Sequence, residues 1–165
     1  MGLFGLGKKK ITETIYAPVN GKLKTLENVN DPVFAQKLMG DGFGVVPAQG
    51  NIYSPVEGII TSVFKTKHAL GLKTSNGLEV MVHMGLDTVE LAGKPFEILV
   101  EEGDKVKVQT PIAKMDLEQV RLAKKDTIIL TIITNTADKI DSSSLSVENN
   151  ADLKNGSKVM EAKLK

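Results

Sequence analysis

The chain has 165 residues, enough for one domain with a buried hydrophobic core. Its 21 lysines and arginines nearly balance its 20 acidic residues, so the charge gives no reason to expect a nucleic-acid-binding protein. The absence of cysteine excludes disulfides, zinc ribbons and thiol nucleophiles, and it is in keeping with a cytoplasmic location.

The first ten residues, MGLFGLGKKK, place apolar side chains before three lysines. This order is the reverse of a secretory signal, and no cleavage site follows it. We expect residues 1–10 to form a flexible tail that makes at most weak contact with an anionic membrane surface. No apolar run in the sequence approaches the ~20 residues that a membrane helix needs.

The first forty residues predict a strand and then a short helix. The strand is expected over 10–19, where β-branched residues precede a Pro-Val pair. The helix is expected over about 32–39, because Asp31 is a suitable N-cap, Pro32 suits the first helical position and Gly40 can end the helix.

The rest of the chain is divided by Gly, Pro, Asn and Asp into further β-rich stretches. These predict strands over 50–56, 58–74, 78–84, 105–115, 127–135 and 157–165. A second short helix is expected over about 117–123, behind Asp116. We interpret the polar stretch 138–157 as a surface connection before the last strand. Many short strands with so little helix favour an antiparallel sandwich or barrel.

A faint internal repeat links two parts of the sequence. APVNGKL at 17–23 and SPVEGII at 54–60 share a small residue, Pro-Val and a Gly that precedes an apolar strand. Such a match suggests a duplicated supersecondary unit, although Pro-x-x-Gly turns also recur by chance.

The stretch GLEVMVHMGLDTVELAG, residues 77–93, contains one of the two histidines. Read as a strand, it directs His83 and Met81 to one face, where an imidazole could meet a partner. The opposite face is expected to pack in the core, because it carries Leu78, Val80, Val82 and Met84.

Asn76-Gly77, between the two histidines, is a strong signal for a two-residue hairpin turn. With these two residues as the loop, Ser75 pairs with Leu78, and His83 lies opposite Leu70.

In this register His68 is a diagonal neighbour of His83, roughly 7–8 Å away. The two strands would then bring both imidazoles to one face, with a hydroxyl and apolar walls from Phe64, Thr66 and Met81. A bulge at Gly71 would break the register. Two histidines in a chain of this length are also compatible with unrelated surface or core residues.

A pair of imidazoles can bind a metal, exchange protons or attack phosphorus. A zinc hydrolase would need a third ligand, for which Asp87 is the candidate. The sequence lacks a Gly-x-Ser-x-Gly motif and a phosphate-binding Gly-Lys-Ser/Thr loop, and we interpret GDGFG at 40–44 as a turn entering a strand. A nucleophilic histidine without a nucleotide site favours phosphate received from another protein.

Several segments closely resemble the glucose-type enzyme IIA of the bacterial phosphoenolpyruvate-dependent sugar phosphotransferase system. The resemblance covers roughly 11–140 and is best over 31–135. Its most specific parts are Thr66-x-His68 and the run VHMGLDTV at 82–89. Further matching segments are PVFAQKLMGDG, SPVEG, KTKHALGLKTSNGLEVMVHMGLDTVELAG, VEEGDKVKVQTPIAKMDL and IITN.

The resemblance implies that His83 is phosphorylated on Nε2, that His68 supports the onward transfer of phosphate and that Thr66 orients the pair by a hydrogen bond. It implies an all-β antiparallel sandwich with a duplicated hybrid motif and two or three short helical segments. Residues 11–165 are expected to form one free-standing IIA domain, a component of a phosphotransferase rather than a stand-alone enzyme.

The resemblance also implies the partners. Phosphate would come from the histidine phosphocarrier protein and pass to a cysteine on the IIB domain of a glucose-type permease, and regulatory targets would be further partners. No cofactor is required, but His68 and His83 could form half of a zinc site that a partner carboxylate completes. The docking surface is expected to be apolar with acidic flanks, formed by Asp31, Phe34, Leu38, Met39, Phe64, Met81, Asp87 and Val89.

Two alternatives remain open. EEGDKVKVQTPIAKMDL, residues 101–117, also resembles half of a biotinyl or lipoyl carrier domain, but that class needs a lysine at a hairpin tip, and here the chain runs into a predicted helix. The second alternative is a zinc hydrolase that uses His68, His83 and Asp87.

Overall fold

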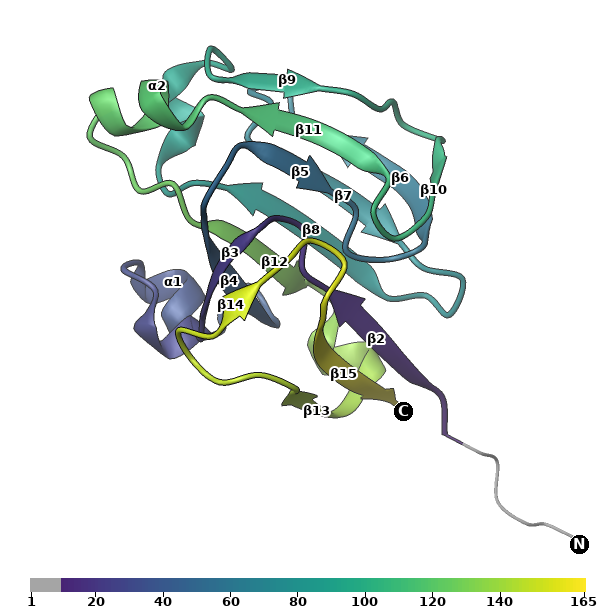
Figure 1. The fold of residues 1–165 in the computed structure, drawn as a ribbon. Helices are drawn as coiled ribbons and strands as arrows, with labels where there is room; N and C mark the ends of the chain where they lie inside the picture. Colours follow the sequence, from purple (N-terminus) through teal and green to yellow (C-terminus); the bar gives the residue numbers. More distant parts are fainter. Residues whose placement is uncertain (1–9) are drawn as a thin grey trace, which may run out of the picture.

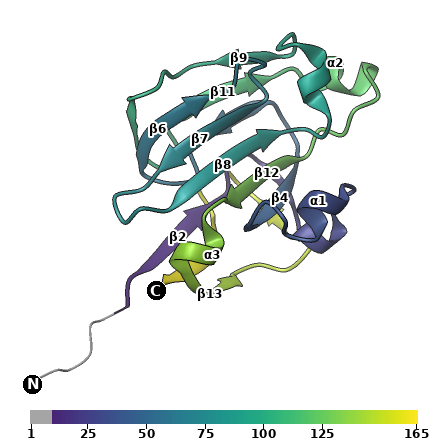
Figure 2. The ribbon, with the colours of Figure 1, turned by 180° about the vertical axis from the view of Figure 1, so that it is seen from behind.

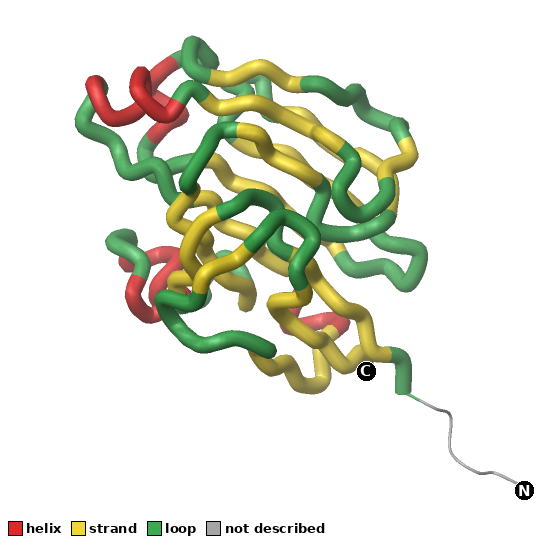
Figure 3. The backbone as a smooth tube through the Cα atoms, viewed as in Figure 1, coloured by secondary structure: helices red, strands yellow, loops and turns green. Residues whose placement is uncertain are grey.

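The structure, a computed structural model, describes residues 10–165 and consists mainly of short strands (Figure 3). Of the tail predicted over 1–10, residues 1–9 lie outside the described residues. The three α-helices of the described part are α1 (Pro32–Ala35), α2 (Leu117–Leu122) and α3 (Thr136–Lys139), and the 3-10 helices are η1 (Leu26–Asn28) and η2 (Thr88–Leu91). No helix within 10–165 is long and apolar enough to cross a membrane.

Strands occupy most of the remaining chain. In chain order they are β2 (Thr12–Tyr16), β3 (Gly21–Lys24), β4 (Asp41–Pro47), β5 (Asn51–Tyr53), β6 (Gly58–Val63), β7 (Ala69–Lys73), β8 (Glu79–Met84), β9 (Phe96–Ile98), β10 (Lys105–Val106), β11 (Pro111–Met115), β12 (Ile129–Ile133), β13 (Ile140–Leu145), β14 (Asp152–Leu153) and β15 (Lys158–Leu164).

The strands form one large sheet and two small ones. The large sheet has the order β10-β6-β7-β8-β12-β4-β3-β14, and the small sheets have the orders β5-β11-β9 and β13-β15-β2. All strand pairs in these sheets are antiparallel. The β5-β11-β9 sheet is stacked over the β6, β7 and β8 part of the large sheet, and β13, β15 and β2 gather near the C-terminus (Figure 1).

The main hydrophobic core fills the space between the large sheet and the two small sheets. It includes the predicted inward face of β8, since Leu78, Val80, Val82 and Met84 are buried there. Residues of β2, β5, β11 and β15 enclose it from the other side, among them Ile15, Ile52, Ile112 and Val159. The antiparallel sandwich expected from the sequence is confirmed.

The predicted duplication is visible in the hydrogen bonds. Tyr16 N–H donates to the carbonyl of Pro55 at 2.9 Å, and Tyr53 N–H donates to the carbonyl of Pro18 at 2.7 Å, so equivalent positions of the two repeats bond reciprocally. The strand order of the large sheet is also symmetric about its centre. Strands β6, β7, β8 and β10 of one half correspond respectively to β3, β4, β12 and β14 of the other. The two halves meet where β8 pairs with β12.

A second, smaller hydrophobic cluster covers the outer face of the large sheet. Its strand residues include Met81 and Leu130, and Phe34 of α1 packs against them. Figure 2 shows α1 beside β4 and β12 on this face. The other members of this outer cluster are Leu26, Val29, Ala69, Leu86, Ile128 and Ile132. Both faces of β8 are therefore largely buried.

Several predicted boundaries were wrong. Residues 58–74 form two strands, β6 and β7, rather than one, and the stretch 105–115 divides into β10 and β11. The predicted turn at 40–44 lies mostly within β4, and the polar stretch 138–157 contains β13 and β14. Strand β3 follows Gly21 of the first repeat, where an apolar strand was expected, but strand β9 and helix α3 were not predicted.

The predicted helix over 32–39 begins as expected but ends early. Asp31 caps it, since its Oδ1 accepts hydrogen bonds from the N–H groups of Val33 and Phe34. The helix ends at Ala35, and Lys37 adopts a left-handed conformation with φ 59° that no helix continues through. The second predicted helix is confirmed as α2, and the Asp116 side chain caps it.

Candidate functional site

The two histidines are carried by neighbouring segments of the large sheet. His83 is on β8, and His68 immediately precedes β7, at the end of the tight turn that joins β6 to β7. Lys67 in this turn has a left-handed backbone with φ 60°. The carbonyl of His68 accepts a hydrogen bond from the N–H of Met84 at 2.7 Å, which fixes this end of the hairpin.

The predicted hairpin register is wrong by one residue. His83 lies opposite Ala69 rather than Leu70. The turn uses one residue more than the two expected: Thr74 N–H donates to the carbonyl of Leu78 at 2.9 Å, and Gly77 has φ +91°. The loop is therefore Ser75, Asn76 and Gly77 rather than Asn76-Gly77 alone.

The histidines still meet, for a different reason. A one-residue slip within a strand would turn His68 to the opposite face, but His68 lies outside β7, after the left-handed Lys67. No bulge occurs at Gly71; the irregularity lies in β6, whose register against β7 shifts between Ile60 and Ser62. The pairing of β7 with β8 runs unbroken from Ala69 to Lys73.

The two imidazole rings contact each other edge to face. Their centroids are 5.0 Å apart and their planes are inclined by 82°. The His83 Nδ1 lies 2.8 Å from the carbonyl oxygen of Gly85. Because a carbonyl oxygen can only accept, Nδ1 carries the proton in this hydrogen bond, and the Nε2 of neutral His83 keeps a free lone pair.

The Nδ1 of His68 is also occupied. It lies 2.6 Å from the Oγ1 of Thr66, the contact that the family resemblance implies. Since each Nδ1 is engaged by a fixed group, the Nε2 atoms of both rings are left for other chemistry.

The surroundings keep both histidines neutral near neutral pH. His68 is only 7% exposed and His83 is partly exposed. Burial lowers the pKa of His68. Burial, and secondarily the neighbouring His68, lower the pKa of His83 to about 4, although the Gly85 carbonyl, Asp31 and Asp87 oppose this shift. A neutral imidazole is the nucleophilic form.

Two phenylalanines flank the pair. The ring of Phe34 is tilted against His83 with centroids 5.1 Å apart, and the ring of Phe64 meets His68 edge-on at 5.4 Å. These rings limit the access of water to the imidazoles from two sides.

The structure divides the predicted apolar docking residues into buried and exposed ones. Phe34 and Met81, which were expected to lie on the docking surface, are only 8% and 7% exposed and belong to the outer cluster. They are therefore not free to contact a partner. The exposed apolar members are Leu38, Met39, Phe64 and Val89, and Leu38 is the most exposed at 69%. Asp31 uses one oxygen to cap α1, and Asp87 is exposed.

Two residues of this region were missed by the sequence reasoning. Val33 is 42% exposed on α1 and lies two residues after the predicted cap, Asp31. Gly85 supplies the carbonyl that fixes His83; its φ of +78° favours glycine, and a Cβ there would lie 2.8 Å from the carbonyl oxygen of Asp126. The glycine two residues after His83 was the signal available in the sequence.

The described residues do not form the site that either alternative, the zinc hydrolase or the biotinyl or lipoyl carrier, would need. Within residues 10–165, His68, His83 and Asp87 do not form a group of three potential metal ligands, so the hydrolase hypothesis lacks its third ligand in the described chain. For a biotinyl or lipoyl carrier, the lysine would have to lie at a hairpin tip, but Lys114 lies within β11, which leads into α2.

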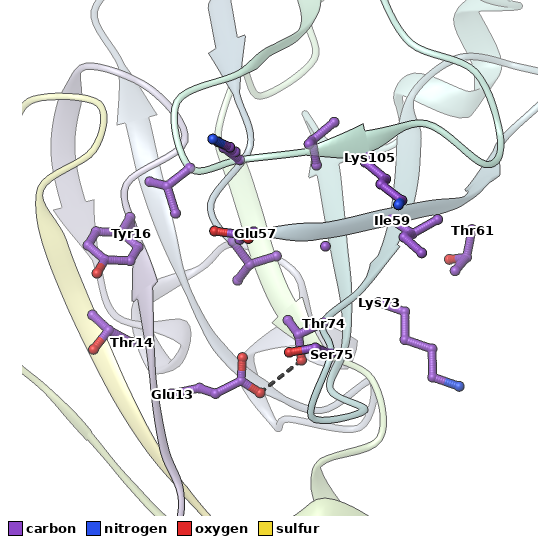
Figure 4. A pocket seen from close by; sticks show the side chains of 15 residues that line it. Glu13, Thr14, Tyr16, Glu57, Ile59, Thr61, Lys73, Thr74, Ser75 and Lys105 are labelled. Atoms are coloured by element: carbon purple, nitrogen blue, oxygen red, sulfur yellow. Dashed lines mark hydrogen bonds between the residues drawn. The ribbon is translucent and has the colours of Figure 1, made fainter.

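A pocket of about 780 Å³ lies elsewhere, between β2, β6, β7 and β10 (Figure 4). The carboxylate of Glu13 accepts a hydrogen bond there from the Thr74 hydroxyl at 2.8 Å, and burial raises the pKa of Glu13. The residues that line this pocket include lysines and glutamates but neither histidine. We therefore assign the candidate site to the histidine pair, because its imidazole nitrogens are available for chemistry, and not to the pocket on the ground of its volume.

Comparisons with known proteins show which family the chain resembles. The sequence profile of the family described as "phosphoenolpyruvate-dependent sugar phosphotransferase system, EIIA 1" matches residues 13–139. Relatives named "PTS system glucose-specific EIIA component" are 51% identical in Staphylococcus epidermidis (strain RP62A) and 50% identical in Staphylococcus aureus (strain COL), each over 135 residues and 81% of both chains.

The fold has a counterpart among solved structures. Glucose permease IIA from Mycoplasma capricolum superposes with a TM-score of 0.80 at 29% sequence identity, and the alignment covers 94% of this chain and 99% of that one.

Proposed function

This chain belongs to the EIIA 1 family of the phosphoenolpyruvate-dependent sugar phosphotransferase system, and we propose that it carries the phosphoryl group on the Nε2 of His83. The observation that carries this assignment is the hydrogen bond from His83 Nδ1 to the Gly85 carbonyl. It fixes the proton on Nδ1 and leaves Nε2 as a nucleophile at neutral pH.

The transfer needs no proton to leave His83. As Nε2 attacks phosphorus, the new N–P bond forms while the bond from phosphorus to the donor nitrogen breaks, and the electron pair of that bond returns to the donor. The His83 ring gains positive charge, which the Gly85 carbonyl stabilises through Nδ1–H.

We assign a supporting role to His68. Its ring lies 5.0 Å from that of His83, centroid to centroid, so an Nε2–H of His68 could donate a hydrogen bond to the phosphoryl oxygens. Thr66 holds the ring in this orientation through Nδ1. His68→Gln should therefore still accept phosphate but pass it on more slowly.

The partners proposed are the histidine phosphocarrier protein as donor and the IIB domain of a glucose-type permease as acceptor, both met in the cytoplasm. The exposed apolar residues Leu38, Met39, Phe64 and Val89 support a shared docking surface, because apolar contact would exclude water from a labile phosphohistidine. Asp31 and Asp87 beside it could pair with basic residues of the donor.

The transfer itself requires no cofactor in this proposal. The two histidines could additionally supply half of a zinc site if a regulatory partner contributed a carboxylate. A titration of such a partner with and without zinc would test this, and equal affinity in both titrations would contradict it.

The decisive experiment is intact-mass measurement after incubation with phosphoenolpyruvate, enzyme I and the histidine phosphocarrier protein. The wild-type chain should gain one acid-labile phosphoryl group only when both carriers are present. His83→Ala should gain none, while His68→Gln, the matched control on the neighbouring ring, should still be labelled. Labelling of His83→Ala would contradict the assignment.

A further inference from the structure

The turn that follows His83 is held by a buried hydroxyl that the proposed transfer does not use. Thr88 is 0% exposed, and its Oγ1 donates a hydrogen bond to the backbone carbonyl of Met84. This is the residue immediately after His83, so the hydroxyl acts on the start of the turn that contains Gly85.

Both peptide groups that flank Gly85 are clamped at their two ends. In the Met84–Gly85 peptide, the carbonyl accepts from the Thr88 hydroxyl and the N–H donates to the carbonyl of Ile128 at 2.8 Å. In the Gly85–Leu86 peptide, the N–H donates to the carbonyl of Asp126 at 3.0 Å and the carbonyl accepts from His83 Nδ1. The two planes together fix the dihedral angles of Gly85.

This clamp decides where the Gly85 carbonyl points. In a trans peptide the C=O and N–H groups point in opposite directions, so an N–H of Leu86 held by Asp126 directs the Gly85 carbonyl toward His83. Rotation of the Met84–Gly85 plane would change the angles at Gly85 and move this carbonyl. Space is also tight, since a Cβ on Gly85 would lie 2.4 Å from the Thr88 Cγ2.

We infer that Thr88 is a positioning residue for the nucleophile: its hydroxyl holds the turn that keeps the proton of His83 on Nδ1 and the lone pair on Nε2. The inference rests on the proposed role of His83. It adds a residue whose hydroxyl bonds the backbone of the turn and not the imidazole. Without the clamp the proton is free to move to Nε2, and in that tautomer Nε2 has no lone pair with which to attack phosphorus.

The test compares Thr88→Val, which keeps the shape and removes the hydroxyl, with Thr88→Ser, which keeps the hydroxyl. Thr131→Val is the matched control, because Thr131 is a buried threonine of the adjacent strand β12 whose hydroxyl has no partner within residues 10–165. Imidazole nitrogen chemical shifts, measured with ¹⁵N-labelled histidine above neutral pH, report which nitrogen of His83 carries the proton.

We expect wild type, Thr88→Ser and Thr131→Val to hold the proton on Nδ1. In Thr88→Val the Nε2–H tautomer should become populated, and phosphate acceptance should slow about five- to tenfold, the effect of one lost hydrogen bond. Restoration of both readouts by Thr88→Ser separates the role of the hydroxyl from a packing role of the residue.

Three results would overturn the inference. The first is a wild-type spectrum with the proton on Nε2, which needs no variant and so decides the case even if Thr88→Val fails to fold. The second is an unchanged tautomer in Thr88→Val, and the third is a Thr88→Ser variant that behaves like Thr88→Val. Failure of the carrier assignment would look different, because wild type would then remain unlabelled in the intact-mass assay while the nitrogen shifts still reported on Thr88.

Discussion

At the scale of single residues, opposing effects act on His83. The Gly85 carbonyl and the negative charges of Asp31 and Asp87 favour the protonated ring, whereas burial and a charged His68 disfavour it. Burial prevails, since the pKa falls to about 4 rather than rising. The site thus combines a fixed proton on Nδ1 with a ring that stays neutral, which is what a nitrogen nucleophile at neutral pH requires.

This shift makes the stability of the protein depend on pH. The pKa of His83 is about 4 in the folded chain, below the 6.5 expected when it is unfolded, so between these values the unfolded chain binds more protons. The free energy of unfolding should therefore fall as the pH decreases from about 6.5 toward 4. His83→Gln removes this contribution, so the stability difference between wild type and variant should change by roughly 2–3 kcal/mol across this window.

Urea unfolding of wild type and His83→Gln in parallel, at several pH values between about 7.5 and 4.5, measures this difference. The carboxylates titrate in both proteins, so their effect cancels. Curves that stay parallel through the window would show that burial does not shift the pKa of His83 as described.

Thr131 allows a second prediction at this scale. It is 1% exposed, and its Oγ1 is a buried side-chain atom without a hydrogen-bond partner in residues 10–165. Burying an unpaired hydroxyl costs about 1–3 kcal/mol in proteins, so Thr131→Val should raise the free energy of unfolding by about 1 kcal/mol. Chemical denaturation with an unchanged m-value checks this. A less stable variant would mean that the hydroxyl is bonded in solution.

At the scale of elements, α1 and the turn after it have one buried face, which packs on the sheet, and one exposed face, which is available to a partner. Phe34 points inward and packs on His83, and Leu38 points outward at 69% exposed. Leu38→Asp should weaken binding of the histidine phosphocarrier protein severalfold and leave the unfolding midpoint nearly unchanged, because surface substitutions usually change stability by less than about 0.5 kcal/mol. Calorimetric binding and thermal melts measure the two effects.

Leu99→Asp is the matched control for this prediction, because Leu99 is 40% exposed and directly follows β9 of the small β5-β11-β9 sheet. It should bind the donor like wild type. Phe34→Ala, in contrast, should cost about 3 kcal/mol of stability, as for other buried aromatic residues. Equal loss of binding in the Leu38 and Leu99 variants would argue against a docking surface around the histidines.

The elements also show what the sequence could predict and why the rest was missed. The alternation along β8 correctly placed His83 and Met81 opposite the core face, because side-chain direction in a strand follows from sequence position alone. The predicted hairpin register was wrong because the turn includes Ser75 as a third loop residue. The Asn-Gly pair indicates a turn but does not decide whether the loop has two or three residues.

Other errors have a common physical origin in left-handed residues and edge strands. Lys67 and Lys37 adopt positive φ although lysine carries no preference for it, so neither the turn before His68 nor the early end of α1 was visible in the sequence. Strand β13, read as a polar connection, lies at the edge of its sheet with mostly exposed residues. An edge strand needs little apolar alternation and leaves a weak signal.

At the scale of the whole molecule, the site arises from a difference between two otherwise similar halves. The β3–β4 connection, residues 25–40, is long and covers the outer face of its half with Leu26, Val29 and Phe34. The corresponding β6–β7 connection, residues 64–68, is a short turn. This turn supplies Thr66 and His68, and Phe34 of the longer connection reaches the His83 ring from the other half.

The same symmetry predicts how the molecule unfolds. Each half contributes one strand to the central pair of the large sheet, in which Val82 of β8 lies opposite Thr131 of β12. Both residues are buried, and one continuous core runs across both halves. Opening either half would expose this shared pair, so we expect β8 and β12 to open only when the entire domain unfolds.

Native-state hydrogen exchange in increasing denaturant tests this expectation. Amides at Val82 and Thr131 should exchange most slowly, with opening free energies equal to the global free energy of unfolding, while edge strands β10, β13 and β14 should exchange through smaller openings. The β6–β7 and β3–β4 amides should converge on the same free energy and the same denaturant slope as the central pair. Two separate convergence values, one for each half, would show that the repeats unfold independently and that the β8–β12 pairing does not couple them.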